Sequence, residues 1–279
     1  MCEFCIKHGE GKRWYLEAKN YGEDLWHDLK RRKVIADFFY NFQEDMGRSL
    51  RQLDGLRSAP KFVQSLVSRL VTRQYKRRHF GQVVPWEDVE RIFQVVNSVV
   101  RVPCVCRRLT TGREDRFCFG ISIDTREGLV GEVIDPSYWK GPDGKGLEHL
   151  EKPIALDMMK DFEKDGLFHS VWTFVAPFVA AICNCDRSDC LAMRMTVTSG
   201  MKVMFKAEYV ASVDWDKCNG CRSCMRVCQF GAVGYSAGAQ RAKIDAYHCY
   251  GCGVCRSVCE NDAIMLQERT AIPAVANDW

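Results

Sequence analysis

The sequence predicts an α+β fold: a helical N-terminal part, a mixed α/β region rich in cysteine, and a small C-terminal domain with pseudo-twofold symmetry. Three observations predict it. Between about residues 21 and 56, apolar residues recur every three or four positions, the period of an amphipathic helix. Over 117–123 apolar residues alternate with polar or small ones, as in a half-buried strand. The segment around Cys218 recurs 31 residues later, around Cys249.

Two further helices are expected in the N-terminal part. Pro60 opens a segment that reaches Arg78. One side of this segment carries its apolar residues: Phe62, Leu66, Leu70 and Val71. Pro85 is followed by two acidic residues, which suits the start of a helix that would run to about Val100. Pro103 then ends the helical part.

The middle of the chain is expected to mix strands and helices. Strands and turns are predicted over 104–150, with a turn at 141–144, and a short helix over 154–168. The apolar stretch 171–182 is predicted to be one buried strand that leads into Cys183. The chain after Arg269 resembles a loose extension. We therefore expect two units, the helical and mixed region 1–205 and the C-terminal domain 206–279.

Cysteine is the unusual feature of the composition, with 16 in 279 residues. They occur in tight groups, and residues 1–5 have neither the basic nor the apolar part of a secretory signal. Metal ligation in a reducing cytoplasm therefore explains these cysteines better than disulfides.

Membrane insertion and nucleic-acid binding are not expected. The longest apolar stretch, 171–183, is too short to span a bilayer and contains Pro177. The net charge of +4 is small. The basic runs at 30–33 and 76–78 are interpreted as solvated helix faces, or else as a docking surface for an acidic redox partner.

The C-terminal repeat contains one cysteine spacing, C-x2-C-x2-C-x3-C, twice. Its two copies place the cysteines as follows: Cys218, Cys221, Cys224 and Cys228, then Cys249, Cys252, Cys255 and Cys259. Three cysteines at two-residue gaps can wrap one loop around three corners of an iron–sulfur cube, whereas zinc motifs rarely repeat this spacing. Glycines 220, 251 and 253 lie between them, where the backbone must bend and point N–H groups at sulfur.

These motifs resemble those of the bacterial-type dicluster ferredoxins over about residues 206–269. The resemblance implies two [4Fe-4S] clusters that exchange low-potential electrons, with the fourth ligand of each cluster supplied by the other motif. It assigns Cys218, Cys221, Cys224 and Cys259 to cluster 1. It assigns Cys249, Cys252, Cys255 and Cys228 to cluster 2. The family usually has proline after the fourth cysteine, where this chain has Gln229 and Glu260.

Six more cysteines form two groups: Cys104, Cys106 and Cys118, then Cys183, Cys185 and Cys190. They supply enough thiolates for a third [4Fe-4S] cluster or a larger centre, with buried, unligated cysteine as the alternative. The groups loosely resemble segments of anaerobic multicluster electron-transfer proteins. Near the N-terminus, Cys2, Cys5 and His8 could bind zinc or iron, help to complete another site, or stay unligated.

These features predict a cytoplasmic iron–sulfur electron-transfer protein that serves as a subunit or partner of an anaerobic oxidoreductase. No P-loop, dinucleotide fingerprint or catalytic acid or base is evident in the sequence. The competing hypothesis is a reductase whose N-terminal cysteines form the active centre, reducing a small substrate or activating a partner's cofactor. A nucleic-acid-associated iron–sulfur protein is a more distant alternative.

Overall fold

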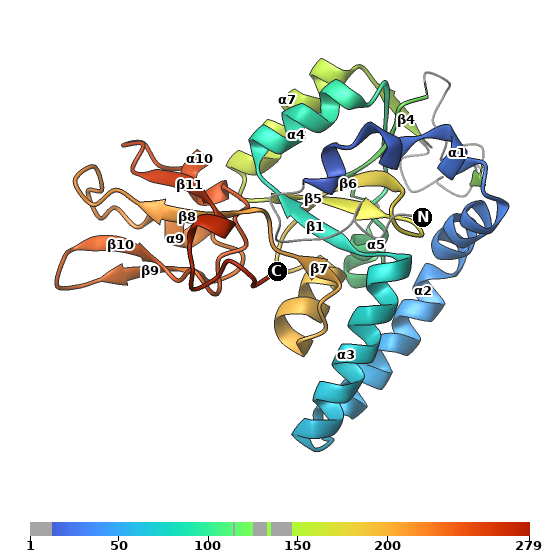
Figure 1. Ribbon diagram of the computed structural model, residues 1–279, viewed down its shortest axis with the longest axis horizontal. Coiled ribbons are helices and arrows are strands. Elements are labelled where there is room, and N and C mark those ends of the chain that lie inside the picture. Colours follow the sequence, from blue (N-terminus) through green and yellow to red (C-terminus); the bar gives the residue numbers. More distant parts are fainter. Residues whose placement is uncertain (1–12, 114, 125–132, 135–146) are drawn as a thin grey trace.

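The computed structural model describes residues 13–113, 115–124, 133–134 and 147–279. It has a mixed α+β architecture, with N-terminal helices, a seven-stranded sheet and a C-terminal cysteine-rich region (Figure 1). In Figure 1 the C-terminal ribbons extend to the left of the sheet and the α2–α3 hairpin extends below it. Both project from the same central sheet.

The central sheet has the strand order β4-β2-β3-β6-β5-β1-β7. The strands have these bounds: β1 (Gly81–Val84), β2 (Ser98–Val102), β3 (Cys118–Ser122), β4 (Glu148–Leu150), β5 (Phe168–Thr173), β6 (Val179–Cys185) and β7 (Met204–Phe205). Neighbours pair antiparallel, except that β1 and β7 are parallel. Strands β1, β3 and β5 are buried along their whole length, so β3 is covered on both faces rather than half-buried as its alternation predicts.

Helices cover both faces of this sheet. They have these bounds: α1 (Glu23–Trp26), α2 (Leu29–Arg57), α3 (Lys61–Arg78), α4 (Trp86–Val95), α5 (Val105–Thr111), α7 (Lys152–Lys164) and α8 (Leu191–Met193), with short 3-10 turns at Trp14–Leu16 and Ala18–Tyr21 and a π-helical turn at Arg194–Thr198. The largest core packs α4, α7 and the first two turns against one face. Side chains of α1 and α2 pack against Phe174 and Phe178 on the other face.

The long helices α2 and α3 confirm the predicted helical period, but the chain is not helical to residue 100. Strand β1 precedes α4, and α4 ends at Val95 rather than near Val100. Val99, Val100 and Val102 then belong to β2. This β-branched run favours a strand, and the Pro103 signal therefore marks the end of β2 rather than of a helix.

Four predictions for the later chain need correction. Residues 105–111, within the stretch predicted as strands and turns, form helix α5. The stretch 171–182 is two antiparallel strands, β5 and β6, because Pro177 lies in the turn and has no N–H for a ladder. The helix predicted over 154–168 ends at Lys164. The segment after Arg269 is not loose, because Val275 is buried and the Arg269 guanidinium donates to the carbonyls of Ala207, Tyr209 and Cys249. The turn predicted at 141–144 lies outside the described residues.

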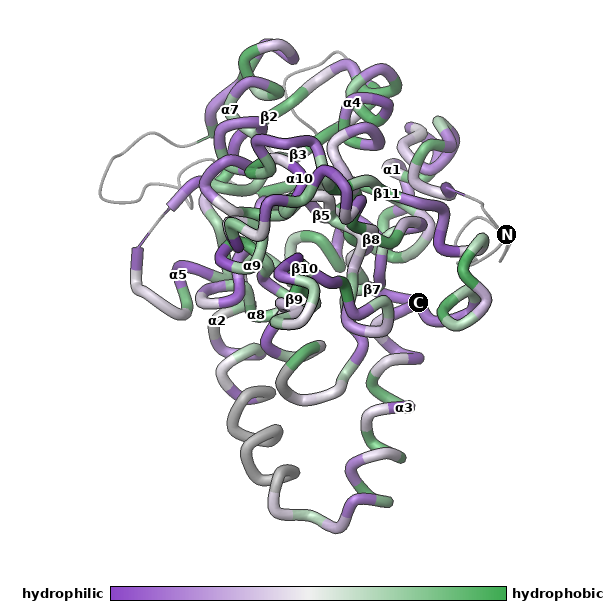
Figure 2. Tube along the Cα trace, turned by 90° about the vertical axis from the view of Figure 1, so that its left-hand side faces the viewer, coloured by the Kyte–Doolittle hydropathy of each residue, from purple (hydrophilic) through white to green (hydrophobic). Residues whose placement is uncertain are grey.

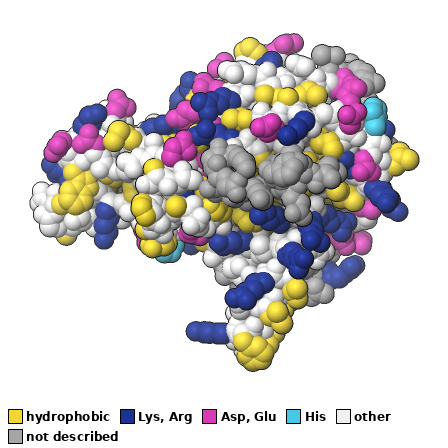
Figure 3. All heavy atoms as spheres, in the orientation of Figure 1, with side chains coloured by type: hydrophobic (Ala, Val, Ile, Leu, Met, Phe, Trp, Pro, Cys, Tyr) yellow, Lys and Arg dark blue, Asp and Glu magenta, His cyan; other side chains and the backbone are white. Residues whose placement is uncertain are grey.

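Helix α3 carries apolar side chains that face solvent. Phe62, Leu66 and Leu70 are exposed, and Figure 3 shows hydrophobic side chains at the free end of the α2–α3 hairpin. Figure 2 shows hydrophobic and hydrophilic residues interspersed along the helix. Among the described residues, none of the helices is both long and apolar enough to cross a membrane.

The C-terminal region repeats one set of elements. Its strands and helices have these bounds: β8 (Tyr209–Val213), α9 (Ser223–Val227), β9 (Val233–Ser236), β10 (Arg241–Ile244), α10 (Val254–Ser257) and β11 (Ile264–Glu268). Helix α10 starts 31 residues after α9, and β11 starts 31 residues after β9, so the sequence repeat is also a structural repeat. Strand β9 pairs with β10, and β8 pairs with β11. Strands β9 and β11 thus begin at equivalent positions of the repeat, Val233 and Ile264.

Candidate metal centres

One small pocket of the C-terminal region brings together cysteines from both motifs. Cys218, Cys221 and Cys224 of the first motif line it together with Cys259 of the second. Val213, Ala242, Ala263 and Ile264 provide its apolar walls. This grouping is the one that a crossed ligand set requires for cluster 1.

The remaining four cysteines of the motifs form a second group. Burial raises the pKa of Cys252, and the nearby thiols of Cys249 and Cys228 raise it further. Burial likewise raises the pKa of Cys255, which is also close to Cys252, Cys249 and Cys228. A thiol in such surroundings keeps its proton in the absence of metal, and metal binding displaces that proton. The structure thus places Cys228 with the second motif, although the ligation itself stays a prediction.

Backbone N–H groups point at sulfur in both groups. The amides of Ala232 and Ala263 donate to the Sγ atoms of Cys228 and Cys259 over 3.2 and 3.3 Å, at equivalent positions of the repeat. The Ala211 amide donates to Cys249 Sγ over 3.3 Å. Donors of this kind favour the anionic form of sulfur and help to set cluster potentials.

Two glycines between the cysteines are required by the fold. Gly251 has φ +69°, and a Cβ atom there would lie 2.1 Å from the carbonyl oxygen of Tyr209. Gly220 has φ +74°, and its Cβ would lie 2.4 Å from the carbonyl oxygen of Gln240. Any side chain would therefore displace the backbone that surrounds the cysteines.

Comparison with known families agrees with this geometry. Residues 217–264 match the 4Fe-4S dicluster domain. This part of the chain is a 4Fe-4S dicluster domain. The dicluster domain holds two [4Fe-4S] clusters and transfers electrons through them. A search among curated proteins found no match.

The two groups of the dicluster domain differ in exposure. Cys221 of the first group is exposed, whereas Cys249 and Cys255 of the second group are buried. We call the first group the outer site and the second the inner site. In the part of the chain that the structure describes, no group of three or more His, Cys, Asp or Glu side chains has an arrangement that could hold a single metal ion. A cluster needs a wider arrangement, because each cysteine binds a different iron.

The six cysteines outside the dicluster domain line one cavity of about 260 Å³. Sequence analysis grouped them in two segments, and the sheet brings the segments together because Cys118 of β3 lies opposite Cys183 of β6. Side-chain contacts link neighbouring thiols in a continuous order: Cys104, Cys118, Cys183, Cys185, Cys190 and Cys106. We call this the six-cysteine cavity.

The thiols of this cavity do not titrate alike. Hydrogen bonds from the Cys183 and Cys190 thiols lower the pKa of Cys185. A hydrogen bond to Cys118, together with burial, raises the pKa of Cys104. One thiolate is thus stabilised by its neighbours, and the cavity brings six thiols close together.

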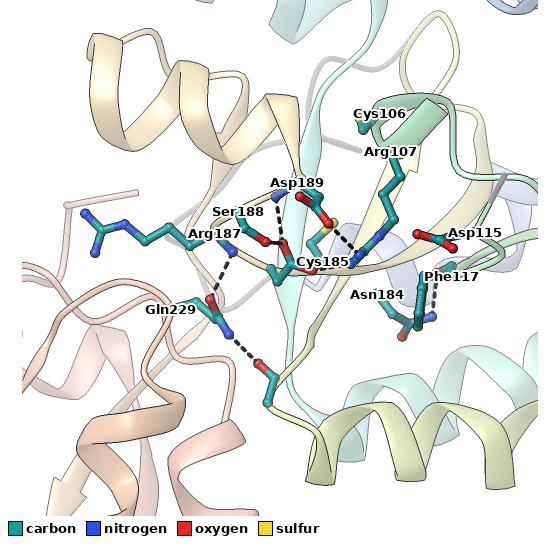
Figure 4. A network of polar contacts seen from close by, with 12 residues as sticks. Cys106, Arg107, Asp115, Phe117, Asn184, Cys185, Arg187, Ser188, Asp189 and Gln229 are labelled. Atoms are coloured by element: carbon teal, nitrogen blue, oxygen red, sulfur yellow. Dashed lines mark hydrogen bonds and ion pairs between the residues drawn. The ribbon is translucent and has the colours of Figure 1, made fainter. Parts of the chain in front are cut away.

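An ion-paired arginine clamps the two cysteine segments together (Figure 4). Arg107, which follows Cys106, pairs with Asp186 and, over 2.9 Å, with Asp189, both in the loop between Cys185 and Cys190. Its guanidinium also lies 4.2 Å from the ring centre of Phe117. Sequence analysis missed this clamp, although a charged residue directly after a cysteine in each segment was the available signal.

Asn184 provides a second tie between the segments, since it lies between Cys183 and Cys185. Its backbone amide and side-chain Nδ2 both donate to the Phe117 carbonyl, over 2.9 and 2.8 Å. Its Oδ1 accepts from His169 Nδ1 over 2.6 Å. The cysteines of β3 and β6 are therefore held in register on both sides.

The six-cysteine cavity continues beyond the sulfurs to an aromatic end between α2, α3 and the sheet. Its aromatic lining comprises Phe38, Phe39, Phe42, Tyr75, His79, Trp172 and Phe174. His79 Nδ1 lies 2.6 Å from the carbonyl oxygen of Thr173, and burial lowers the pKa of His79 to about 4. The neutral imidazole therefore donates from Nδ1 and keeps Nε2 as an acceptor. No pattern in the sequence indicates that these distant residues converge.

The last predicted site residues, Cys2, Cys5 and His8, lie outside the described residues, so their ligation stays a prediction.

Proposed function

We propose that this protein is an iron–sulfur electron-transfer protein with three metal centres: the two clusters of the dicluster domain and a further cluster in the six-cysteine cavity. The observation that carries the proposal is the convergence of six thiols from separate segments on one cavity. Cysteines that only fill a core have no need to adjoin one another in a continuous order. Cluster 1 takes Cys259 and cluster 2 takes Cys228 as the crossed ligands.

The surroundings of the cavity fit an anionic cluster. Backbone amides of Arg107 and Met193 lie within hydrogen-bonding reach of the Cys104 and Cys190 sulfurs. The Arg107 guanidinium adds a positive charge beside Cys104, although its two ion pairs offset that charge. A cluster held by thiolates needs both kinds of support, because burial otherwise disfavours negative charge.

We further propose a cytoplasmic protein that works with a larger oxidoreductase in anaerobic metabolism. Low-potential clusters with an exposed cysteine are sensitive to oxygen, and an electron-transfer protein needs partners that reduce and oxidise it. Redox proteins, rather than nucleic acid, are the partners that this chemistry requires.

Iron and sulfide analysis of the anaerobically purified chain tests the third centre. Two clusters give about eight irons per chain, and a third [4Fe-4S] cluster gives about twelve. Cys185→Ala should remove the additional iron and leave the EPR signals of the dicluster domain unchanged. Met46→Ala, at the aromatic end of the same cavity, serves as the control and should retain all of the iron. Eight irons in the parent chain would refute the third centre.

A second candidate function is favoured by the aromatic end of the cavity: a reductase that passes electrons to a small substrate bound there. An apolar compartment next to redox-active ligands is the usual form of a small-molecule site. Benzyl isocyanide, an apolar molecule that binds accessible iron, should then perturb the EPR signal of the third centre alone. Phe42→Trp, which adds bulk to that end, should weaken the perturbation. An unperturbed signal at saturating isocyanide would contradict this second function.

A further inference from the structure

The inner site of the dicluster domain and the six-cysteine cavity share one hydrophobic cluster. Cys185 and Cys190 of the cavity belong to it, and Cys228 and Cys252 of the inner site pack against it. Among the outer-site cysteines, Cys224 belongs to a different hydrophobic core, and Cys218 and Cys259 pack against that core. Cys249, Cys255 and Cys228 of the inner site also belong to it or contact it. Of the two iron–sulfur sites of the dicluster domain, the inner site therefore borders the six-cysteine cavity.

Aromatic rings fill the space between these two sites. Phe230, two residues after Cys228, stacks on Tyr250 with ring centres 4.0 Å apart and planes 7° apart. Phe230 also contacts Phe168, with ring centres 4.8 Å apart. Phe168 is the register partner of Cys185 in the central sheet. A compact series of rings thus connects the Cys228 loop with the Cys185 strand.

The residue between Cys228 and Phe230 fixes this junction. Gln229 stands where the ferredoxin pattern usually has proline, and its amide reaches out of the dicluster domain (Figure 4). Its Oε1 accepts from the backbone N–H of Arg187 over 2.9 Å, within the loop between Cys185 and Cys190. Its Nε2 donates to the carbonyl of Gly166 over 2.8 Å. Proline could make neither bond, so the departure from the pattern has a structural role here.

We propose that Gln229 and Phe230 form the bridge for electrons between the inner cluster and the six-cysteine centre. The inference rests on the proposed third centre and adds the order in which electrons pass through the three sites. Electrons enter at the exposed outer site, pass to the inner site and leave through Phe230 toward Cys185. The rate of electron tunnelling falls steeply with distance. The packed rings hold the two sites close together and exclude water from the gap between them.

The transfer at this bridge is a one-electron step. A reduced inner cluster loses one electron, and the six-cysteine centre gains it, with no bond made or broken in the chain. The electron comes from a low-potential donor protein at the outer site, for which dithionite substitutes in the experiment. Gln229 and Phe230 are positioning residues in this step, because neither touches iron.

The experiment measures electron transfer within the fully loaded chain. After mixing with substoichiometric dithionite, rapid-freeze EPR follows the signal of the inner cluster and then that of the six-cysteine centre. Phe230→Leu and Gln229→Pro should each slow the second step several-fold and weaken the magnetic interaction between the two centres. Iron content and both midpoint potentials should stay unchanged. Gln229→Glu should be slowed less than Gln229→Pro, because it keeps an acceptor for the Arg187 amide.

Phe80→Leu is the matched control, since Phe80 is also a buried phenylalanine ring but lies in a different core. It should lower stability without slowing the second step. If both bridge variants transfer electrons at the parent rate while the chain holds about twelve irons, the bridge is refuted and the third centre stands. A parent chain with about eight irons refutes the proposed function instead. If a bridge variant fails to fold, Tyr250→Leu replaces it. This variant removes the ring that stacks on Phe230 and should likewise slow the second step.

Discussion

The dicluster domain and the six-cysteine cavity gather sulfur in opposite ways. In the dicluster domain, each motif supplies three cysteines within seven residues, in a loop bent by glycines such as Gly220 and Gly251. In the cavity, strands β3 and β6 and the starts of α5 and α8 bring together cysteines that are up to 86 positions apart, from Cys104 to Cys190. The first site depends on local backbone shape, and the second depends on the whole sheet.

Removal of one crossed cysteine should have the strongest effect, the loss of a whole cluster. Cys259→Ala should lose the outer cluster and keep the inner one, because a cubane with three thiolates and no fourth ligand is labile. Cys228→Ala should do the reverse. Iron content should fall by one cluster in each variant, and EPR identifies which cluster remains.

Two reference variants make this test specific. Cys221→Ala removes an uncrossed ligand of the outer site, and Cys252→Ala removes one of the inner site. The spectrum of Cys259→Ala should match that of Cys221→Ala, and Cys228→Ala should match Cys252→Ala. The opposite matching would show that each motif ligates its own cluster.

The next largest effect should come from the arginine clamp of the six-cysteine cavity. Arg107→Ala leaves Asp186 and Asp189 without their partner and should cost about 2–4 kcal/mol of unfolding free energy. Iron should be lost from the six-cysteine centre first, while the dicluster signals persist. Arg113→Ala removes an exposed ion pair with Asp115 and should change little. Equal losses from the two variants would show that the clamp is not structural.

A pH effect should test the contact between the central sheet and the dicluster domain, separately from the two cysteine sites. Glu208 precedes β8 and accepts from Gln82 of β1 over 3.3 Å, and burial raises the pKa of Glu208 to about 7. The folded state therefore holds this proton more tightly than the unfolded chain does. Stability should fall as the pH rises from about 4.5 to 7, by about 2–3 kcal/mol at most.

Glu208→Gln provides the measurement for this effect. The variant should match the parent near pH 4.5 and exceed its unfolding temperature at pH 8, in anaerobic scans at one rate. A constant difference across that range would mean that Glu208 does not titrate between the two states.

The smallest expected effect concerns Glu260, the second residue that replaces proline. Its charge reaches the exposed thiol of Cys221. Glu260→Gln should raise the midpoint potential of the outer cluster by at most about 40 mV, the one-electron equivalent of ~1 kcal/mol, because the site is exposed. The inner cluster should not shift. Redox titration monitored by EPR resolves the two, and a potential that stays constant would argue against a role for this charge.

How far the sequence predicts each site follows from the same contrast. The spacing from Cys218 to Cys228 and its repeat are local, so the motif and its glycines could both be predicted. The sequence also showed that the other six cysteines form two groups. The two groups meet because the sheet register places Cys118 opposite Cys183. This register depends on strands β1, β2 and β5. The helical and apolar patterns of the sequence did not predict the existence or the bounds of these strands.

The same register has a consequence for handling the protein in air. Cys118 and Cys183 are direct partners on adjacent antiparallel strands, and directly opposed Cα atoms in such pairs lie about 4.5–5.5 Å apart. That spacing falls within the range of disulfide bonds. We therefore expect oxygen to join these two thiols whenever the proposed third centre is empty. The cross-link would use two of the six thiols and block reloading, so reconstitution of the proposed third centre should succeed only after reduction.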